Sequence, residues 1–212
     1  MERTIVIIGG SFNPPTIAHM MLAEITKKQI SANYVLFVPA KISYMMEWKK
    51  YQNSDILSDD IRMQALESLE NEWLKIERCE LDGNVSGTSY DTLNYIKNKY
   101  QTQRVYFAIG SDKLNEIPKW YNSEQLLNEN KFIVIQRNND DIQQIIQDSA
   151  FLKSHNESFI ICDESDDSTQ QISSTKVREA MDKGDYDEIR TMVPYSVYQI
   201  ITNNIDIQKQ DE

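Results

Sequence analysis

Strand-like and helical patterns alternate along this chain of 212 residues, and the alternation limits the folds that it can adopt. Short apolar runs rich in β-branched residues occur at 3–8, 34–38, 104–109, 131–136 and 158–162. Helical patterns occur at 17–30, 58–70, 89–100, 122–128 and 140–152. This order is typical of a parallel sheet with helices on both of its faces. The sequence therefore predicts an α/β protein with a Rossmann-like, doubly wound parallel sheet and right-handed crossovers.

Ligands of such sheets bind beyond the carboxyl ends of the strands. The segments that follow the predicted strand ends, and that we expect along one edge of the sheet, are 9–19, 39–50, 110–113 and 137–139. The stretch 39–57 is long and polar, and long loops in compact domains are often functional. The alternative for this stretch is a surface loop whose aromatic side chains pack locally.

The composition argues against several classes of partner. The net charge is −11 and the pI is near 4.7, whereas nucleic-acid-binding proteins usually present a basic face. No apolar run is long enough to span a bilayer, so we expect a cytoplasmic protein with no membrane partner. Cys79 and Cys162 lie far apart without metal-ligand spacing, so we expect reduced thiols and no structural zinc site. The length suits one domain, 1–212, that ends in a helical portion at about 172–203.

The segment from Ile5 to His19 joins a strand pattern to a helical pattern through two glycines and two prolines. Gly9 and Gly10 allow a tight turn and a close approach of a ligand to the backbone. Thr16 is a candidate N-cap, and His19 falls in the first helical turn. A helix N-terminus attracts anions through its N–H groups and its dipole, and a histidine adds a donor. The alternative, an ordinary connection, does not explain why one of two histidines lies here.

A second candidate anion site lies at 172–178. Ser173 or Ser174 is suited to cap a helix that Gly184 ends. Arg178 then lies one turn into this helix, on the side of the N-terminal amides. The alternative is a well-capped amphipathic helix with Arg178 in solvent.

Two helix N-termini with basic side chains suit a polyphosphate and thus indicate a nucleoside triphosphate. The chain has no Walker A loop and no protein-kinase motif, so another arrangement must hold the phosphates. An acidic protein needs local positive charge for this purpose. The available candidates are Lys41, Lys49, Lys50, Arg62, Arg137, Lys176 and Arg178. We expect each of them except Arg178 to be an ordinary surface charge.

The two motifs together resemble those of the nucleotidyltransferase superfamily, and within it those of the nicotinate-nucleotide adenylyltransferases. Gly9–His19 resembles the family's Gly-Gly-Ser-Phe-Asn-Pro-Pro-Thr/His-x-x-His, and Ile172–Arg178 resembles its Ile-Ser-Ser-Thr-x-x-Arg. Between them, Tyr90–Leu93, Ile109–Asp112 and Val134–Arg137 are similar to further family segments. The resemblance covers residues 3 to about 201.

The resemblance implies the transfer of AMP from ATP to nicotinate mononucleotide, which forms deamido-NAD and pyrophosphate in NAD biosynthesis. The acceptor phosphate is already an anion, so catalysis needs alignment and charge neutralisation and no general base. The family also implies Mg²⁺ that arrives with ATP and is held mostly by phosphates and water, without a protein metal site. Its members often form dimers or larger assemblies, so a homo-oligomer is left open.

The resemblance further implies roles for individual residues. His19 is expected to donate to the α-phosphate with Thr16 beside it, and Arg178 to stabilise the leaving pyrophosphate. The other ATP-binding candidates are Gly10, Ser11, Phe12, Gly110, Asp112, Ser174 and Thr175. The candidates for the acceptor site are Tyr44, Ser89, Trp120 and Arg137. Three of these have simpler alternatives: Asp112 as a helix cap, Trp120 as a core aromatic and Arg137 as a surface residue.

Several residues depart from the family pattern. Ala18 stands where many members have glycine, Thr88 and Ser89 replace Tyr-Thr, and Pro39–Tyr44 replaces Pro-Pro-His-Lys. These departures leave open nicotinamide mononucleotide as the preferred or co-equal acceptor. The remaining alternatives are a pantetheine-phosphate adenylyltransferase, a cytidylyltransferase, and a non-catalytic nucleotide-binding regulator with the same fold.

Overall fold

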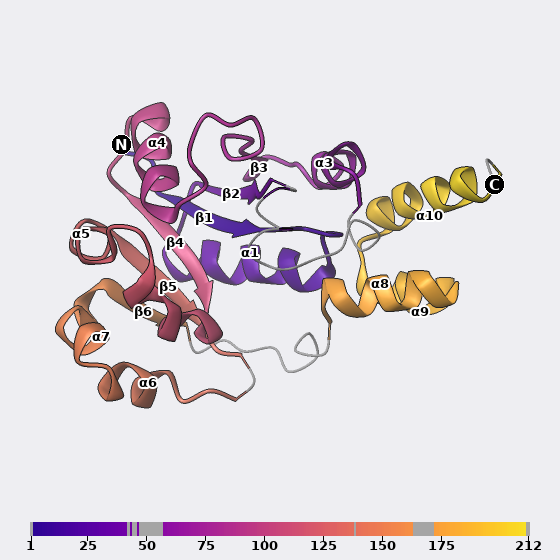
Figure 1. The fold of residues 1–212 in the computed structure, drawn as a ribbon. Coiled ribbons are helices and arrows are strands. Elements are labelled where there is room, and N and C mark those ends of the chain that lie inside the picture. The colour runs from indigo at the N-terminus through magenta and orange to yellow at the C-terminus, as the bar shows by residue number, and fades with distance from the viewer. Residues whose placement is uncertain are drawn as a thin grey trace.

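A computed structural model describes residues 2–41, 43, 46, 57–137, 139–162 and 172–210 of the chain. Its centre is a six-stranded sheet with the order β3-β2-β1-β4-β5-β6, in which each neighbouring pair is parallel (Figure 1). The strands are β1 Ile5–Gly10, β2 Tyr34–Pro39, β3 Leu74–Ile76, β4 Val105–Gly110, β5 Lys131–Ile135 and β6 Phe159–Cys162. This sheet confirms the predicted doubly wound α/β fold.

Helices connect the strands and extend the chain beyond the sheet. Those before β6 are α1 Ile17–Gln29, α3 Asp59–Glu67, α4 Ser89–Tyr100, α5 Ser123–Glu129, α6 Ile142–Asp148 and α7 Ala150–Ser154. Two 3₁₀ helices accompany them, η2 Ser111–Lys119 and η3 Asn156–Ser158. The predicted helical extension consists of α8 Ser174–Lys183, α9 Tyr186–Met192 and α10 Tyr195–Gln210. Figure 1 shows these three helices grouped at the end of the molecule toward which β1 points.

The sheet has a hydrophobic core on each face because successive side chains of a strand point to opposite sides. In β1, Ile5 and Ile7 belong to one buried cluster, and Val6 and Ile8 belong to the other. The Val6 face is covered by α1, α3 and the C-terminal helices α8, α9 and α10. The Ile5 face is covered by α4, η2, α5, α6 and α7. Burial on both faces explains why the strands read as continuous apolar runs.

The structure corrects three local expectations. β3 was not predicted, since its three residues are too few to show a strand pattern. The helix predicted over 140–152 is divided into α6 and α7 at Ser149, whose side chain caps α7 by accepting a hydrogen bond from the Leu152 N–H. The segment after β4, for which no helix was predicted, forms η2 with Pro118 inside it.

The strand order reverses between β1 and β4, which places a topological switch point at their carboxyl ends. Both strands end in glycine there, Gly10 in β1 and Gly110 in β4. The sheet therefore brings the two glycine-ended segments to the crevice where ligands of this fold class bind. In the described part of the chain, no helix has the length and hydropathy needed to cross a membrane. Cys79 and Cys162 are both buried and form no disulfide.

Candidate active site

The loop that follows β1 is packed into the protein rather than exposed. Ser11, Phe12, Asn13 and Thr16 are all buried. Phe12 has a positive φ of 44°, and its ring contacts those of Phe37 and His19 at centroid distances of 4.8 and 5.0 Å. A Cβ atom on Gly10 would lie 3.3 Å from the Phe12 ring, so glycine allows this tight fold. The backbone of the loop is thus held in one shape.

His19 and Thr16 form a hydrogen-bonded pair at the N-terminus of α1. Thr16 is the N-cap, and its main-chain N–H donates to His19 Nδ1 at 3.0 Å. The Thr16 hydroxyl lies 2.8 Å from the same nitrogen. A main-chain N–H can only donate, so Nδ1 accepts and the neutral ring carries its proton on Nε2. The arrangement gives His19 the donor nitrogen that the expected phosphate contact requires.

The second motif forms the start of α8 and contacts the first motif directly. Of the two predicted caps, Ser173 is the N-cap, and its side chain accepts from the Lys176 N–H at 3.2 Å. Ser174 Oγ donates to the Pro14 carbonyl at 2.8 Å, and Arg178 Nη1 donates to the Asn13 carbonyl at 2.8 Å. These contacts join segments about 160 residues apart and bring the N-termini of α1 and α8 together.

The contacts of Arg178 also decide between the two readings of α8. The guanidinium is half-buried, and its Nη2 donates to Thr175 Oγ1 at 3.3 Å. The alternative that left Arg178 in solvent is therefore wrong. Gly184 ends the helix in the left-handed conformation, with φ 68°, as predicted.

At the end of β4, two charged side chains converge over Gly110. A Cβ atom on this glycine would lie 2.3 Å from Asp112 Oδ1 and 3.0 Å from Arg137 Nε. A larger residue there would displace these two side chains. Asp112 lies inside η2 with Lys113 Nζ 3.7 Å from its Oδ2, so it does not cap the helix, whose N-cap position is Gly110. Arg137 is exposed, which fits the alternative that it is a surface residue.

Ser111 links the ends of β4 and β5. Its hydroxyl is buried, accepts from the Arg137 N–H at 2.8 Å and donates to Asp140 Oδ2 at 2.7 Å. The Asp140 N–H in turn donates to the Arg137 carbonyl at 2.8 Å. This network fixes the main chain that carries Arg137.

The acceptor candidates occupy the neighbouring part of the same edge. Ser89 begins α4, whose cap Thr88 accepts from the Asp91 N–H at 3.3 Å. Tyr90 in the same turn contacts the ring of Tyr121 edge-on, with centroids 6.2 Å apart, which brings α4 next to the segment after η2. Trp120 lies in that segment, half-buried against Phe107 and Phe132 at ring distances of 6.5 Å. Tyr44 lies outside the described residues.

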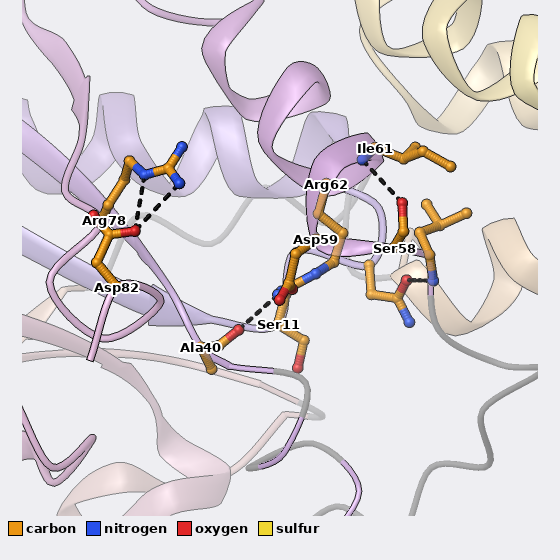
Figure 2. Close-up of polar contacts among 10 residues, drawn as sticks. Ser11, Ala40, Ser58, Asp59, Ile61, Arg62, Arg78 and Asp82 are labelled. Carbon is orange, nitrogen blue, oxygen red and sulfur yellow. Dashed lines mark hydrogen bonds and ion pairs between the residues drawn. The ribbon is translucent and has the colours of Figure 1, made fainter.

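Arg62 is the site feature that sequence reasoning missed. It was expected on the surface, but it is 1% exposed. Its guanidinium donates to the carbonyls of Ser11 and Ala40 and forms an ion pair with Asp59 (Figure 2). A signal was present in the sequence, since Arg62 shares the apolar face of its helix with Ala65 and Leu66, three and four residues on.

One carboxyl group near this edge has a strongly shifted pKa. Burial raises the pKa of Glu80, which follows β3, to about 7, although a hydrogen bond from Thr92 Oγ1 at 2.7 Å opposes the shift. Among the described residues, no three His, Cys, Asp or Glu side chains come together in a way that could hold a metal ion.

The chain is similar to known proteins over most of its length. Residues 7–180 match the family described as cytidylyltransferase-like. A probable nicotinate-nucleotide adenylyltransferase of Endomicrobium trichonymphae is 30% identical over 200 residues, which cover 94% of this chain and 96% of that protein. The nicotinate-nucleotide adenylyltransferase of Bacillus subtilis is 29% identical over 135 residues, 64% of this chain and 70% of that protein.

A solved structure shares the fold over nearly the whole chain. It is the Plasmodium falciparum nicotinic acid mononucleotide adenylyltransferase in complex with NaAD, with a TM-score of 0.69 and 22% identity. The match covers 96% of this chain and 98% of that one. The sheet and its C-terminal helices are therefore an arrangement that is known in solved proteins.

Proposed function

The chain belongs to the cytidylyltransferase-like family, and within it to the nicotinate-nucleotide adenylyltransferases, and from this premise we propose how its residues transfer AMP from ATP to nicotinate mononucleotide. The products are deamido-NAD and pyrophosphate, in NAD biosynthesis. The observation that carries the proposal is the pair of hydrogen bonds from Ser174 and Arg178 to the carbonyls of Pro14 and Asn13. They bring two helix N-termini close together, and helix N-termini attract the negative charge of phosphates.

In the proposed reaction, a phosphate oxygen of the mononucleotide attacks the α-phosphorus of ATP, and pyrophosphate leaves. The nucleophile is already ionised, so no side chain has to remove a proton. His19 Nε2–H donates to a non-bridging oxygen of the α-phosphate, where negative charge develops in the transition state. Thr16 keeps the imidazole in the tautomer and orientation that this contact requires.

The positions of the elements support the remaining ATP contacts that we propose. The main chain of Gly10–Phe12 holds phosphate oxygens, and Ser174, Thr175 and Arg178 hold the β- and γ-phosphates until pyrophosphate leaves. Gly110 and Asp112 face the adenosine, with the Asp112 carboxylate on the ribose hydroxyls. Mg²⁺ enters as part of the ATP substrate and is held by phosphates and water.

The acceptor lies toward α4 and the segment after η2. Trp120 stacks on the pyridine ring, with Ser89 and Arg137 nearby. Tyr44, the fourth candidate, lies outside the described residues. An exposed arginine favours an acceptor with a ring carboxylate over one with a neutral amide. This charge supports nicotinate mononucleotide as the preferred substrate, with nicotinamide mononucleotide as the second.

The proposal is tested by steady-state pyrophosphate release with Mg–ATP and four acceptors in parallel: nicotinate mononucleotide, nicotinamide mononucleotide, phosphopantetheine and phosphocholine. We expect the highest kcat/KM with nicotinate mononucleotide. A preference for either of the last two would point to another activity of the superfamily. Binding of ATP without pyrophosphate release under any acceptor would instead point to a non-catalytic regulator.

A further inference from the structure

Arg62 is a buried cation that the proposed reaction leaves without a role. Its side chain is the largest of those that are almost completely buried, and its ion-pair partner Asp59 is 42% exposed. Burying an arginine is unfavourable unless hydrogen bonds compensate, and an apolar residue of similar size would fill the same position in α3 without that penalty. The hydrogen-bond partners of the guanidinium therefore indicate the role of this buried arginine.

Both main-chain partners of Arg62 lie just beyond the carboxyl ends of neighbouring strands. Its Nη1 donates to the carbonyl of Ser11, after β1, and its Nη2 donates at 2.8 Å to the carbonyl of Ala40, after β2. Figure 2 shows the arginine reaching from α3 toward these two carbonyls, with Asp59 beside it. A guanidinium is planar and carries its donors in a rigid fork, so the two bonds fix both carbonyls relative to α3.

Fixing a carbonyl also fixes the N–H group on the other side of its peptide bond. The Ser11–Phe12 peptide is trans, because the cis bond in the described residues is Asn13–Pro14. In a planar trans peptide the C=O and N–H point in opposite directions. The bond from Arg62 to the Ser11 carbonyl thus turns the Phe12 N–H away from α3.

The preceding peptide is held in the same way. The Gly10 carbonyl accepts from the Ala40 N–H at 2.9 Å, on the β2 side of β1. The Ser11 N–H of that peptide consequently points to the opposite side of β1, toward β4 and the switch-point crevice. Arg62 holds Ala40 as well, so it supports the orientation of both amides.

We infer that Arg62 is a positioning residue for the nucleotide phosphates, which acts through the Ser11 and Ala40 carbonyls on the amides of Ser11 and Phe12. The inference rests on the proposed function, because it takes this loop as the phosphate-binding loop. It predicts an effect confined to the phosphates. Ligands without phosphate at this position lose nothing when Arg62 is replaced.

The test compares binding of Mg–ATP and of adenosine by calorimetry in the wild type, Arg62→Lys and Arg62→Met. We expect Arg62→Met to bind ATP more weakly by a factor on the order of 10 or more, because the Ser11 and Phe12 N–H groups would no longer point toward the phosphates. Arg62→Lys keeps the charge but not the fork, and we expect a loss of several-fold. The dissociation constant of adenosine should stay at the wild-type value in both variants.

Arg78→Met is the matched control, because Arg78 is half-exposed and pairs with Asp82 and Glu67 near the same end of the sheet. It should bind both ligands as the wild type does. Equal losses for ATP and adenosine, or no loss for ATP, would overturn the inference. If Arg62→Met does not fold, Arg62→Lys alone decides between these outcomes. A wild type that binds ATP but releases no pyrophosphate contradicts the proposed function only, since the comparison of the variants needs no turnover.

Discussion

The main-chain N–H of Thr16 determines which nitrogen of His19 carries the proton. By donating to Nδ1 at 3.0 Å, it leaves the Nε2–H form as the tautomer that satisfies both groups. The ring of Phe12 also contacts the imidazole, with ring centroids 5.0 Å apart. One backbone bond and one aromatic contact therefore orient the residue to which we assign the α-phosphate.

Replacing His19 by alanine should separate catalysis from folding. We expect kcat to fall by a factor on the order of 10² or more, since one transition-state donor is lost. The melting temperature should change little, because the contacts with Thr16 that the variant loses lie at a helix end, where a capping interaction is worth about 1 kcal/mol. His155→Ala, which removes the other histidine far along the chain, is the control and should retain wild-type kcat. Near-normal turnover of His19→Ala would refute the assignment.

Glu80 should make the stability of the protein depend on pH. Its pKa is raised from 4.5 to about 7 by burial, so the folded protein holds the proton more tightly than the unfolded chain. The free energy of unfolding therefore falls as pH rises from about 4.5 to about 7, and the full penalty applies above that range. Glu80→Gln keeps an oxygen that can accept from Thr92 Oγ1 and removes the charge.

We expect Glu80→Gln to be more stable than the wild type at pH 8, by on the order of 3 kcal/mol, and close to it at pH 4.5. Urea denaturation at the two pH values measures this difference. The control is Glu72→Gln, because Glu72 is exposed. Parallel stability curves for Glu80→Gln and the wild type would show that the carboxyl is not held in its neutral form.

At the scale of elements, α1 and α8 act as a pair because α8 is hydrogen-bonded to the loop that immediately precedes α1. Capping signals in the sequence located both N-termini, and the structure adds the contacts between them. Capping is local, so a sequence reveals it within a few residues. The bonds from Ser174 to Pro14 and from Arg178 to Asn13 depend on how the chain returns over the sheet, which no local pattern encodes.

The network around Ser111 gives a second prediction at this scale. Asp140→Ala removes the acceptor of the Ser111 hydroxyl, and the loop that carries Arg137 should become less well positioned. We expect a several-fold higher KM for nicotinate mononucleotide with an almost unchanged KM for ATP. Asp148→Ala, which removes an exposed carboxylate at the end of α6, is the control. If the KM of ATP rose and that of nicotinate mononucleotide did not, the loop would belong to the ATP site instead.

For the whole molecule, the sheet could be predicted from the sequence, whereas some of the contacts at the carboxyl ends of its strands could not. Five of the six strands coincide with apolar runs of the sequence, whereas β3 is too short to produce such a run. The parallel order places the glycine-ended segments together, as predicted from topology. Arg62 was wrongly expected on the surface because arginine is a charged residue. Its hydrogen-bond partners are main-chain carbonyls of distant segments, and no sequence pattern shows which carbonyls a side chain will meet. The single-domain organisation and the roles of the site residues stay predictions.

We assign both motifs to one ATP molecule, whose α-phosphorus receives the attack, and this assignment joins every part of the proposed site. It is tested most directly by following the label from ATP that carries ³²P at the α or at the γ position, with nicotinate mononucleotide as the acceptor. We expect the α label in the dinucleotide product and the γ label in pyrophosphate, both in the wild type and, more slowly, in His19→Ala. Transfer of the γ label to the mononucleotide, or no incorporation of the α label, would contradict it.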